Sequence, residues 1–445
     1  MDKRTFLRLS SSILAGVPLL TSFKNLTFQE KLKNWAGNLQ YSTSNIHYPT
    51  SVEEVQLLIK RFDKVKALGS RHCFNDIADS KFALIGMEKM NKVVSINKSA
   101  AEVTIEGGMN YGQLSPYLES NGFALHNLAS LPHISVAGAC TTATHGSGVK
   151  NANLSTIVTA LEFVAADGTV HNLTKKENRE KFLGAVVSLG AIGVITKVTL
   201  ALVPSFQMRQ YVFEELPLAE LSSNFAKIMS AGYSVSLFTD WQKNSVNEVW
   251  VKLRPEENFD GRNQFFGAKP VNKNVHPIIE LSAENCTEQM GVPGVWYERL
   301  PHFKMGFTPS SGKELQAEYF VPARNAVDAI MAIQRMGKEI SPHLFISEIR
   351  TIAADNLWLS PAHGQDMVAI HFTWKQEWSA VSKLLPKIEQ ELAPYNVKPH
   401  WGKLFSVPKS VLAARYARMN DFKALAQEYD PKGKFVNDYL SSNIF

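Results

Sequence analysis

An eight-residue loop places the strongest constraint on how this chain can fold. The loop, residues 69–76, follows Val-Lys-Ala-Leu at residues 65–68, a mostly apolar run with the composition of a short buried strand. Glycine lacks the Cβ atom that keeps other groups away from the backbone, so the turn beginning at Gly69 can bring its amides close to a phosphate. Ligands commonly bind at the carboxyl ends of strands. The sequence therefore predicts an anion-binding loop after a strand, with His72 inside it.

The length of the chain favours two domains. One core rarely serves 445 residues, and a content of 45% apolar and 10% aromatic residues is enough for two. Residues 40–204 contain a capping pattern, Ser51 followed by Glu54, and then short strands joined by turns. In residues 205–445 strands and helices alternate, which predicts a second α+β domain around a mostly antiparallel sheet. Residues 255–312 have little periodicity and are interpreted as long surface excursions.

The individual elements follow from apolar periodicity and from turn residues. The expected strands are 64–68, 93–96, 103–105, 160–166, 194–202, 233–238, 249–253, 316–321, 344–352 and 367–374. The expected helices are 52–62, 111–121, 218–228, 323–336 and 378–392.

Charge and missing motifs exclude several classes of protein. The 47 basic and 41 acidic residues are dispersed along the chain, so the net charge of +6 does not indicate a nucleic-acid partner. Three widely spaced cysteines provide neither a disulfide framework nor the C-x-x-C spacing of a metal site, and no metal is expected. The sequence has no G-x-G-x-x-G after a strand, no Walker lysine loop and no H-E-x-x-H helix. Nothing therefore indicates a nicotinamide enzyme, a nucleotide hydrolase or a zinc peptidase.

Residues 1–25 have the pattern of a targeting segment. Lys3, Arg4 and Arg8 precede an apolar, serine-bearing run. This start resembles a twin-arginine export signal with lysine at the first arginine position. The alternative is an amphipathic N-terminal helix on a cytoplasmic protein, and the sequence leaves both open. No later stretch approaches the roughly 20 apolar residues that span a bilayer.

Four separated motifs resemble a known family. They are the loop 69–76, the run of small and hydroxyl residues 135–148, Glu348-Ile349-Arg350, and residues 400–403, His-Trp-Gly-Lys. In this order they resemble the alditol and aldonolactone oxidases of the vanillyl-alcohol oxidase superfamily. The resemblance covers most of the chain after about residue 40. It implies a PCMH-type FAD-binding domain at 40–204 and a substrate domain at 205–445, whose C-terminal segment returns to the flavin.

The resemblance also implies FAD attached covalently through an imidazole nitrogen of His72. Such an attachment raises the potential of the flavin. Without the motif, His72 would be interpreted as an ordinary structural histidine. Cys73 and Cys140 are interpreted as packing residues and not as a second tether. The other implied FAD contacts are Gly69, Ser70, Arg71, Cys73, Phe74, Asn75, Ser130, Ser135, Gly138, Thr142, Ala143, Thr144, His145, Ile195 and His400.

Two expected strands carry polar pairs on one face. Glu348 and Arg350 alternate in an apolar strand, and so do His371 and Thr373, so each pair points to one side of its strand. Burial of the charged pair is unfavourable unless its members are paired or bind a ligand, and a structural ion pair is the alternative. The resemblance implies that Ser130, together with Glu348, Arg350 and Thr373, contacts substrate hydroxyls.

The resemblance assigns catalytic roles to three side chains. Lys403, assisted by Arg350, would stabilise negative charge near the flavin N1, and His371 is a candidate proton acceptor. We therefore expect an FAD-dependent enzyme that oxidises the terminal hydroxyl of an alditol, such as xylitol or sorbitol, to the aldose and reduces dioxygen to hydrogen peroxide. One alternative is an aldonolactone oxidase or dehydrogenase acting on D-arabinono-1,4-lactone or L-gulono-1,4-lactone. A flavin-free saccharide-binding protein is the non-enzymatic alternative.

Overall fold

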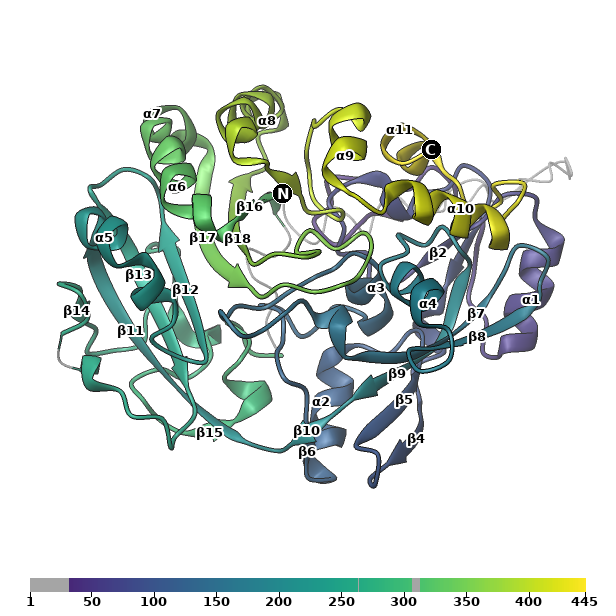
Figure 1. Ribbon diagram of the computed structural model, residues 1–445, viewed down its shortest axis with the longest axis horizontal. Coiled ribbons are helices and arrows are strands. Elements are labelled where there is room, and N and C mark those ends of the chain that lie inside the picture. Colours follow the sequence, from purple (N-terminus) through teal and green to yellow (C-terminus); the bar gives the residue numbers. More distant parts are fainter. Residues whose placement is uncertain (1–31, 263, 306–312) are drawn as a thin grey trace, which may run out of the picture. The chain divides into compact units, whose positions relative to one another are not determined.

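Small sheets form the first part of the structure and one large antiparallel sheet forms the second (Figure 1). The computed structural model describes residues 32–262, 264–305 and 313–445. The expected targeting segment, 1–25, lies outside these residues. Among the described residues, no helix combines the length and the apolar character needed to cross a membrane.

A three-stranded parallel sheet delivers the loop 69–76. Its order is β1-β3-β2, and helix α1 packs on it through Val55 and Ile59. The capping pattern is confirmed in part: Ser51 Oγ accepts from Glu54 N, but the Glu54 carboxylate accepts from Thr50 N. The bounds are β1 Ile46–His47, α1 Val52–Arg61, β2 Lys66–Leu68 and β3 Leu84–Gly86.

A five-stranded antiparallel sheet, in the order β4-β5-β9-β7-β8, completes the first part. Gly168, in the turn between β7 and β8, has φ +85°, which glycine adopts without strain. The bounds are β4 Val93–Asn97, β5 Glu102–Glu106, α2 Tyr111–Ser120, β6 Phe123–Ala124, α3 Val136–Thr141, β7 Val158–Val164, β8 Val170–Thr174, α4 Arg179–Val186, β9 Val194–Ala201 and β10 Val203–Pro204. Strands β6 and β10 pair with each other.

The large sheet has the order β14-β11-β13-β12-β17-β18-β16-β19, with β15 also pairing with β11. All its pairs are antiparallel, and α5, α6 and α8 bury their apolar faces in its core, so the predicted α+β class is confirmed. The strand bounds are β11 Gln207–Pro217, β12 Ser234–Thr239, β13 Ser245–Leu253, β14 Lys269–Pro270, β15 Gly294–Val295, β16 Glu314–Pro322, β17 Leu344–Ile352, β18 Met367–Lys375 and β19 Lys398–Pro399. The helices are α5 Leu218–Met229, α6 Ala326–Arg335, α7 Gly337–Ile340 and α8 Trp378–Leu392.

Strand β11 was not among the expected elements. Its apolar alternation is interrupted by Gln210, which is fully buried and donates from Nε2 to Thr287 O. The backbone acceptor satisfies the amide nitrogen of this buried glutamine, although in the sequence the residue resembles a surface residue.

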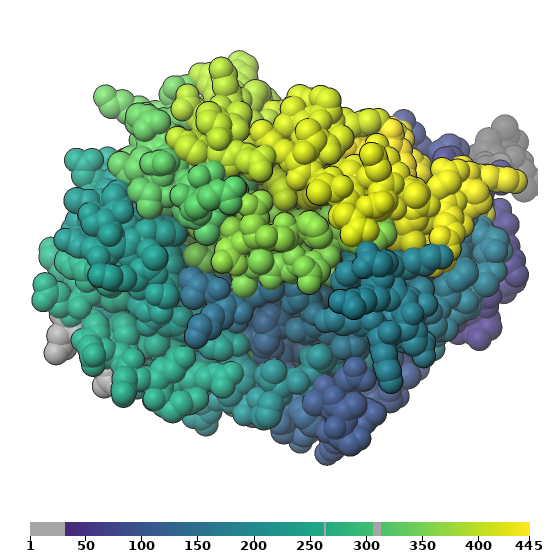
Figure 2. Space-filling view, in the orientation of Figure 1, coloured from purple at the N-terminus to yellow at the C-terminus, as the bar shows by residue number. Residues whose placement is uncertain are grey.

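The last helices of the chain return to the first core. These are α9 Lys409–Arg415, α10 Met419–Tyr429 and α11 Asp438–Asn443. Leu412, Phe422 and Leu440 are buried in the same cluster as the five-stranded sheet. In Figure 2 the yellow C-terminal surface adjoins the teal surface that precedes residue 200. The expected domain bounds, 40–204 and 205–445, stay a prediction.

The interpretation of residues 255–312 as surface excursions is wrong for part of their length. Trp296 is fully buried in the first core, and its Nε1 donates to Glu119 Oε2 at 2.9 Å. His302 is also buried, at 5% exposure. Periodicity could not reveal these anchors, because each is a single residue between irregular segments.

We predict that Trp296→Ala lowers the free energy of unfolding by about 3–5 kcal/mol, because it removes a large buried ring and leaves Glu119 without that donor. Trp378→Ala is the control: this ring is 53% exposed, and we expect a change below about 0.5 kcal/mol. Urea titrations of both variants and the wild type measure the difference. Equal losses would show that Trp296 does not anchor this segment.

Candidate active site

One cavity is lined by residues from both parts of the chain. It includes every side chain expected to act in catalysis or to contact substrate: Ser130, Glu348, Arg350, His371, Thr373 and Lys403. It also includes most of the expected flavin contacts: Gly69, Ser70, Arg71, His72, Cys73, Phe74, Ser135, Gly138, Thr142, Thr144, His145, Ile195 and His400. The sequence motifs, although separated by more than 300 residues, therefore converge.

Asn75 and Ala143 do not line the cavity, which corrects their expected place. Asn75 Nδ2 instead donates to Trp401 O at 2.8 Å and to Lys403 O at 2.7 Å. Asn75 thus connects the loop 69–76 to residues 400–403 by hydrogen bonds outside the cavity. Ala143 is buried in a turn with φ +55°, and its side chain packs in the first core beneath the run 135–148.

The two small-residue loops meet at Ser135. Ser135 N donates to Ser70 Oγ at 2.9 Å, and a Cβ atom at Gly69 or Gly138 would lie 2.6 Å from Ser135 Oγ. The backbone amides of residues 71–73 donate to no acceptor within the described part of the chain. Consecutive free amides in a turn form an anion-binding concavity, so the loop suits a phosphate.

His72 lies in the wall of the cavity with one ring nitrogen unused. Its Nδ1 contacts Ser70 O at 3.0 Å, while Nε2 is buried and has no partner among the described residues. Trp35 stacks on the imidazole, with ring centroids 5.1 Å apart. Burial lowers the pKa of His72 to about 4. The ring is therefore neutral near pH 7 and keeps a nucleophilic lone pair.

The cysteines near the loops lack thiolate character. Burial raises the pKa of both Cys73 and Cys140 to about 12. A thiol is a poor nucleophile in its protonated form. Cys140 is packed in the first core, and a Cβ at Gly402 would lie 3.2 Å from Cys73 Sγ.

A buried carboxylate, Glu318 on β16, organises the charges of the cavity. It is 1% exposed, and Lys403 Nζ lies 2.7 Å from its Oε2. Arg350 Nη2 and His145 Nε2 lie 2.9 Å and 3.2 Å from Oε1. Burial alone would raise the pKa of Glu318, but Lys403, His145 and Arg350 outweigh it and hold this pKa well below its ordinary value.

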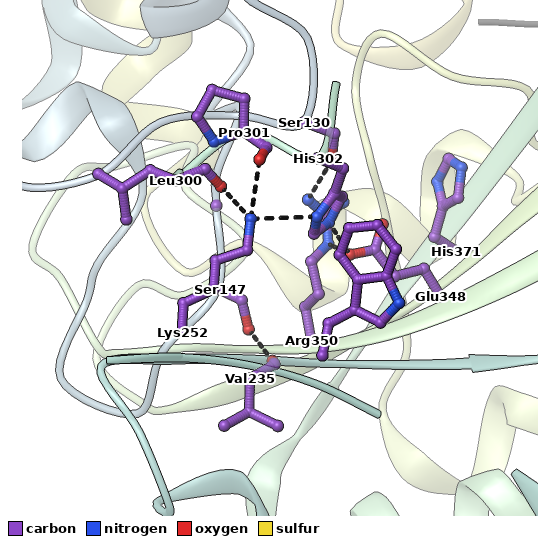
Figure 3. A network of polar contacts seen from close by, with 12 residues as sticks. Ser130, Ser147, Val235, Lys252, Leu300, Pro301, His302, Glu348, Arg350 and His371 are labelled. Carbon is purple, nitrogen blue, oxygen red and sulfur yellow. Dashed lines mark hydrogen bonds and ion pairs between the residues drawn. The ribbon is translucent and has the colours of Figure 1, made fainter. Parts of the chain in front are cut away.

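Glu348 and Arg350 form a second, linked pair on β17. Both are 5% exposed, and Arg350 Nε lies 3.5 Å from Glu348 Oε1. The pKa of Glu348 is lowered, because Arg350 and His302 outweigh the desolvation caused by burial. Arg350 Nη1 lies 3.4 Å from Ser130 Oγ (Figure 3). The two carboxylates therefore balance Arg350 and Lys403.

His371 lies between Lys403 and Thr373. Its Nδ1 is 2.8 Å from Lys403 Nζ, and its Nε2 is 3.0 Å from Thr373 Oγ1. Burial, and then the charge of Lys403, lower the pKa of His371 to about 4, so the ring is neutral near pH 7. Burial also lowers the pKa of Lys403, while Glu318 opposes that shift.

Glu318 and His302 belong to this cluster, although the sequence reasoning did not select them. His302 Nε2 lies 2.7 Å from Glu348 Oε1. A signal for Glu318 exists: Glu314, Gln316 and Glu318 alternate along β16, the same pattern that marked Glu348 and Arg350. His302 has no such signal, since it follows Pro301 in an irregular segment. No group of three or more metal-ligating side chains occurs among residues 32–262, 264–305 and 313–445.

Comparison with known proteins supports a flavin-binding fold. The family described as FAD binding domain matches residues 44–174, and the family described as D-arabinono-1,4-lactone oxidase matches residues 308–443. A cholesterol oxidase from Brevibacterium sterolicum has a similar fold, with a TM-score of 0.77 at 15% identity over 97% of this chain and all of that chain. Fold and matched families define an FAD-dependent oxidase of the vanillyl-alcohol oxidase type.

Two curated relatives cover nearly the whole chain. Alditol oxidase from a Streptomyces species is 44% identical over 92% of this chain and 97% of that protein. L-gulono-1,4-lactone dehydrogenase from Mycobacterium tuberculosis is 29% identical over 91% of this chain and 97% of that protein. The chain belongs to the alditol oxidase family.

The residues of the cavity fit FAD. The free amides of residues 71–73 and the glycines around Ser135 suit its pyrophosphate. The unpartnered His72 nitrogen and the cationic Lys403 lie in the wall of the same cavity. Ile195 adds an apolar side chain to the wall, which suits a flat ring system.

We predict that Glu318→Gln lowers the free energy of unfolding at pH 7 by about 3–5 kcal/mol, because Lys403 and Arg350 lose a buried counter-charge. The folded pKa of Glu318 lies below its ordinary value of 4.5, so its contribution is present above pH 4.5 and is lost as the pH falls. The variant should therefore lose less stability on acidification than the wild type.

The control for this prediction is Glu339→Gln, which breaks an exposed ion pair with Lys387. We expect it to change stability by about 0–1 kcal/mol. Urea titrations at pH 7 and near pH 4 compare the variants with the wild type. A Glu318→Gln protein as stable as this control at pH 7 would refute the counter-charge role.

Proposed function

We propose that the protein oxidises the terminal hydroxyl of an alditol, such as xylitol or sorbitol, to the aldose, with dioxygen as electron acceptor and hydrogen peroxide as product. The observation that carries this proposal is the buried Glu348–Arg350 pair facing the flavin cavity. A carboxylate and a guanidinium offer an acceptor and several donors, which suits a chain of hydroxyl groups. The similarity to the Streptomyces alditol oxidase supports the same substrate class.

Substrate hydroxyls are bound by four side chains in this proposal. Glu348 accepts from a hydroxyl, and Arg350 donates to another. Ser130, 3.4 Å from Arg350 Nη1, and Thr373, next to His371, can both donate and accept. Glu348 and Arg350 are held by β17, Thr373 by β18, and Ser130 by the segment that precedes α3, so the polyol is oriented by a rigid frame.

Bound FAD supplies the hydride acceptor and is reoxidised by dioxygen. Lys403, with Arg350, stabilises the negative charge that develops in the cavity, and Glu318 holds both cations in place. The hydroxyl proton needs a neutral acceptor, and His371 provides one through Nδ1. In this proposal Lys403 turns from His371 to Glu318, its second partner at 2.7 Å, when Nδ1 takes the proton.

We further propose that His72 holds FAD covalently. The neutral buried ring with one unused nitrogen supports an attachment there. The raised pKa values of Cys73 and Cys140 argue against a second tether through either thiol.

A sugar lactone is the second candidate substrate. The match of residues 308–443 to the D-arabinono-1,4-lactone oxidase family favours it, because this stretch includes Glu318, Glu348, Arg350 and Lys403. A lactone ring presents fewer hydroxyl donors to Glu348 than an open-chain polyol does.

The substrate prediction is tested by anaerobic reduction. We expect xylitol or sorbitol to bleach the oxidised flavin spectrum, and air to restore it with one hydrogen peroxide per polyol. L-gulono-1,4-lactone and D-arabinono-1,4-lactone are the comparison substrates. Reduction by a lactone and by no alditol would reject the proposed substrate in favour of the alternative.

We predict that His72→Ala abolishes covalent attachment while the fold persists. After denaturation and gel electrophoresis, the wild type should retain flavin fluorescence on the protein band and the variant should not. His343→Ala is the control, because His343 pairs with Glu377 at the surface. Fluorescence retained by denatured His72→Ala protein would overturn the assignment, and its far-ultraviolet circular dichroism verifies the fold.

A further inference from the structure

Lys252, a buried lysine on β13, lies behind Glu348 and has no part in the reaction described above. It is 1% exposed. Its Nζ lies 2.6 Å from Leu300 O, 2.9 Å from Pro301 O and 3.3 Å from His302 Nδ1 (Figure 3). An ammonium has three hydrogens, and each of them has an acceptor here. Lys252 therefore fastens the irregular segment around residue 301 to the large sheet.

His302 transmits this contact to Glu348. Its Nε2 lies 2.7 Å from Glu348 Oε1, and an ionised carboxylate accepts only, so Nε2 carries a hydrogen. Nδ1 then shares one further proton with Lys252 Nζ. Whichever nitrogen holds that proton, the two residues together carry one positive charge. Phe238 and Trp250 pack edge-on against the imidazole, at 5.4 Å and 5.3 Å, and fix its plane.

The contacts of Glu348 are one-sided. His302 and Arg350 both approach Oε1, at 2.7 Å and 3.5 Å. Oε2 has no hydrogen-bond partner among the described residues, and Glu348 lines the cavity. With an imidazole donor and a guanidinium both at Oε1, the other oxygen is free to accept from a ligand.

We propose that Lys252 and His302 are positioning residues that keep Glu348 ionised and turn its free oxygen toward the substrate. The proposal rests on the proposed function, since the ligand of Glu348 is taken to be a substrate hydroxyl. Neither residue acts on the reacting atoms directly. His302 contacts Glu348 at Oε1, and Lys252 contacts His302. Their effect is to prepare an acceptor before the polyol arrives.

Several charged or titratable groups face this chain of contacts. Glu348 faces Arg350 on its own strand, His371 on β18, and His302 in the irregular segment before β16. Lys252 faces Glu348, Cys286, Arg299 and Arg350. Removing Lys252 takes away the group that contacts His302 Nδ1, so the imidazole is no longer held against Glu348 Oε1 from its far side.

The first test is Lys252→Met in the holoenzyme, with xylitol as substrate. We expect KM to rise about 10- to 100-fold, with a smaller change in kcat, because a hydroxyl contact made equally in substrate and transition state is weakened. The control is Lys398→Met: Lys398 is also buried, but its Nζ donates to Pro361 O, away from Glu348. It should leave KM unchanged, and an equal rise of KM in both lysine variants would overturn the proposal.

The second test separates the donor from the bulk of His302. In His302→Gln the amide nitrogen can replace Nε2 as a donor to Glu348, whereas His302→Leu has no donor. We expect His302→Gln to keep KM within about threefold of the wild type and His302→Leu to raise it about 10- to 100-fold. Equal kinetics of the two variants would overturn the positioning role.

A third measurement is independent of turnover. In protein labelled with ¹⁵N-histidine, the Nδ1 resonance of His302 should move toward that of an unprotonated nitrogen in Lys252→Met and stay in place in Lys398→Met. An unchanged resonance in Lys252→Met would overturn the proposed contact. Failure of xylitol to reduce the wild-type flavin would instead reject the proposed function, and the resonance would still decide whether Lys252 and His302 are coupled.

Discussion

The site depends on the burial of Glu318. One carboxylate, 1% exposed, contacts Lys403 and Arg350 and so joins β16, β17 and the segment after β19. Two cations in a cavity of low polarity would repel each other, and Glu318 makes their proximity possible. The large sheet can thus present positive charge to a bound flavin while the sheet remains stable. With Glu348 included, two buried carboxylates face the two cations Arg350 and Lys403.

Apolar periodicity was enough to predict most of the sheets and helices. β17 and β18 are long apolar strands, and their interior polar pairs were recognised because side chains alternate across a strand. β11 was missed, since Gln210 breaks its alternation yet finds a backbone acceptor. Trp296 was missed for another reason: a single buried ring within an irregular segment leaves no pattern. Local rules therefore describe elements well, and they fail where isolated residues make long-range contacts.

Side-chain alternation along strands also predicts part of the set of residues that line the cavity. The alternation that selected Glu348 and Arg350 also occurs at Glu314, Gln316 and Glu318, so the central carboxylate was within reach of the sequence. His302 was not, because its role depends on Lys252 fastening Leu300 and Pro301 to β13. The positions of Asn75 and Ala143 likewise required the fold. Both lie in motifs that line the cavity, but their own contacts point away from it.

The return of the C-terminal segment has a consequence for the order of events during biosynthesis. Phe74 N donates to Gly402 O, and Asn75 Nδ2 donates to Lys403 O, 328 residues later in the chain. Contacts this distant in sequence form late, because a long loop must close first. The wall around His72 therefore becomes complete only after the ribosome has added residue 403. A nascent chain interrupted before residue 402 carries an open cradle.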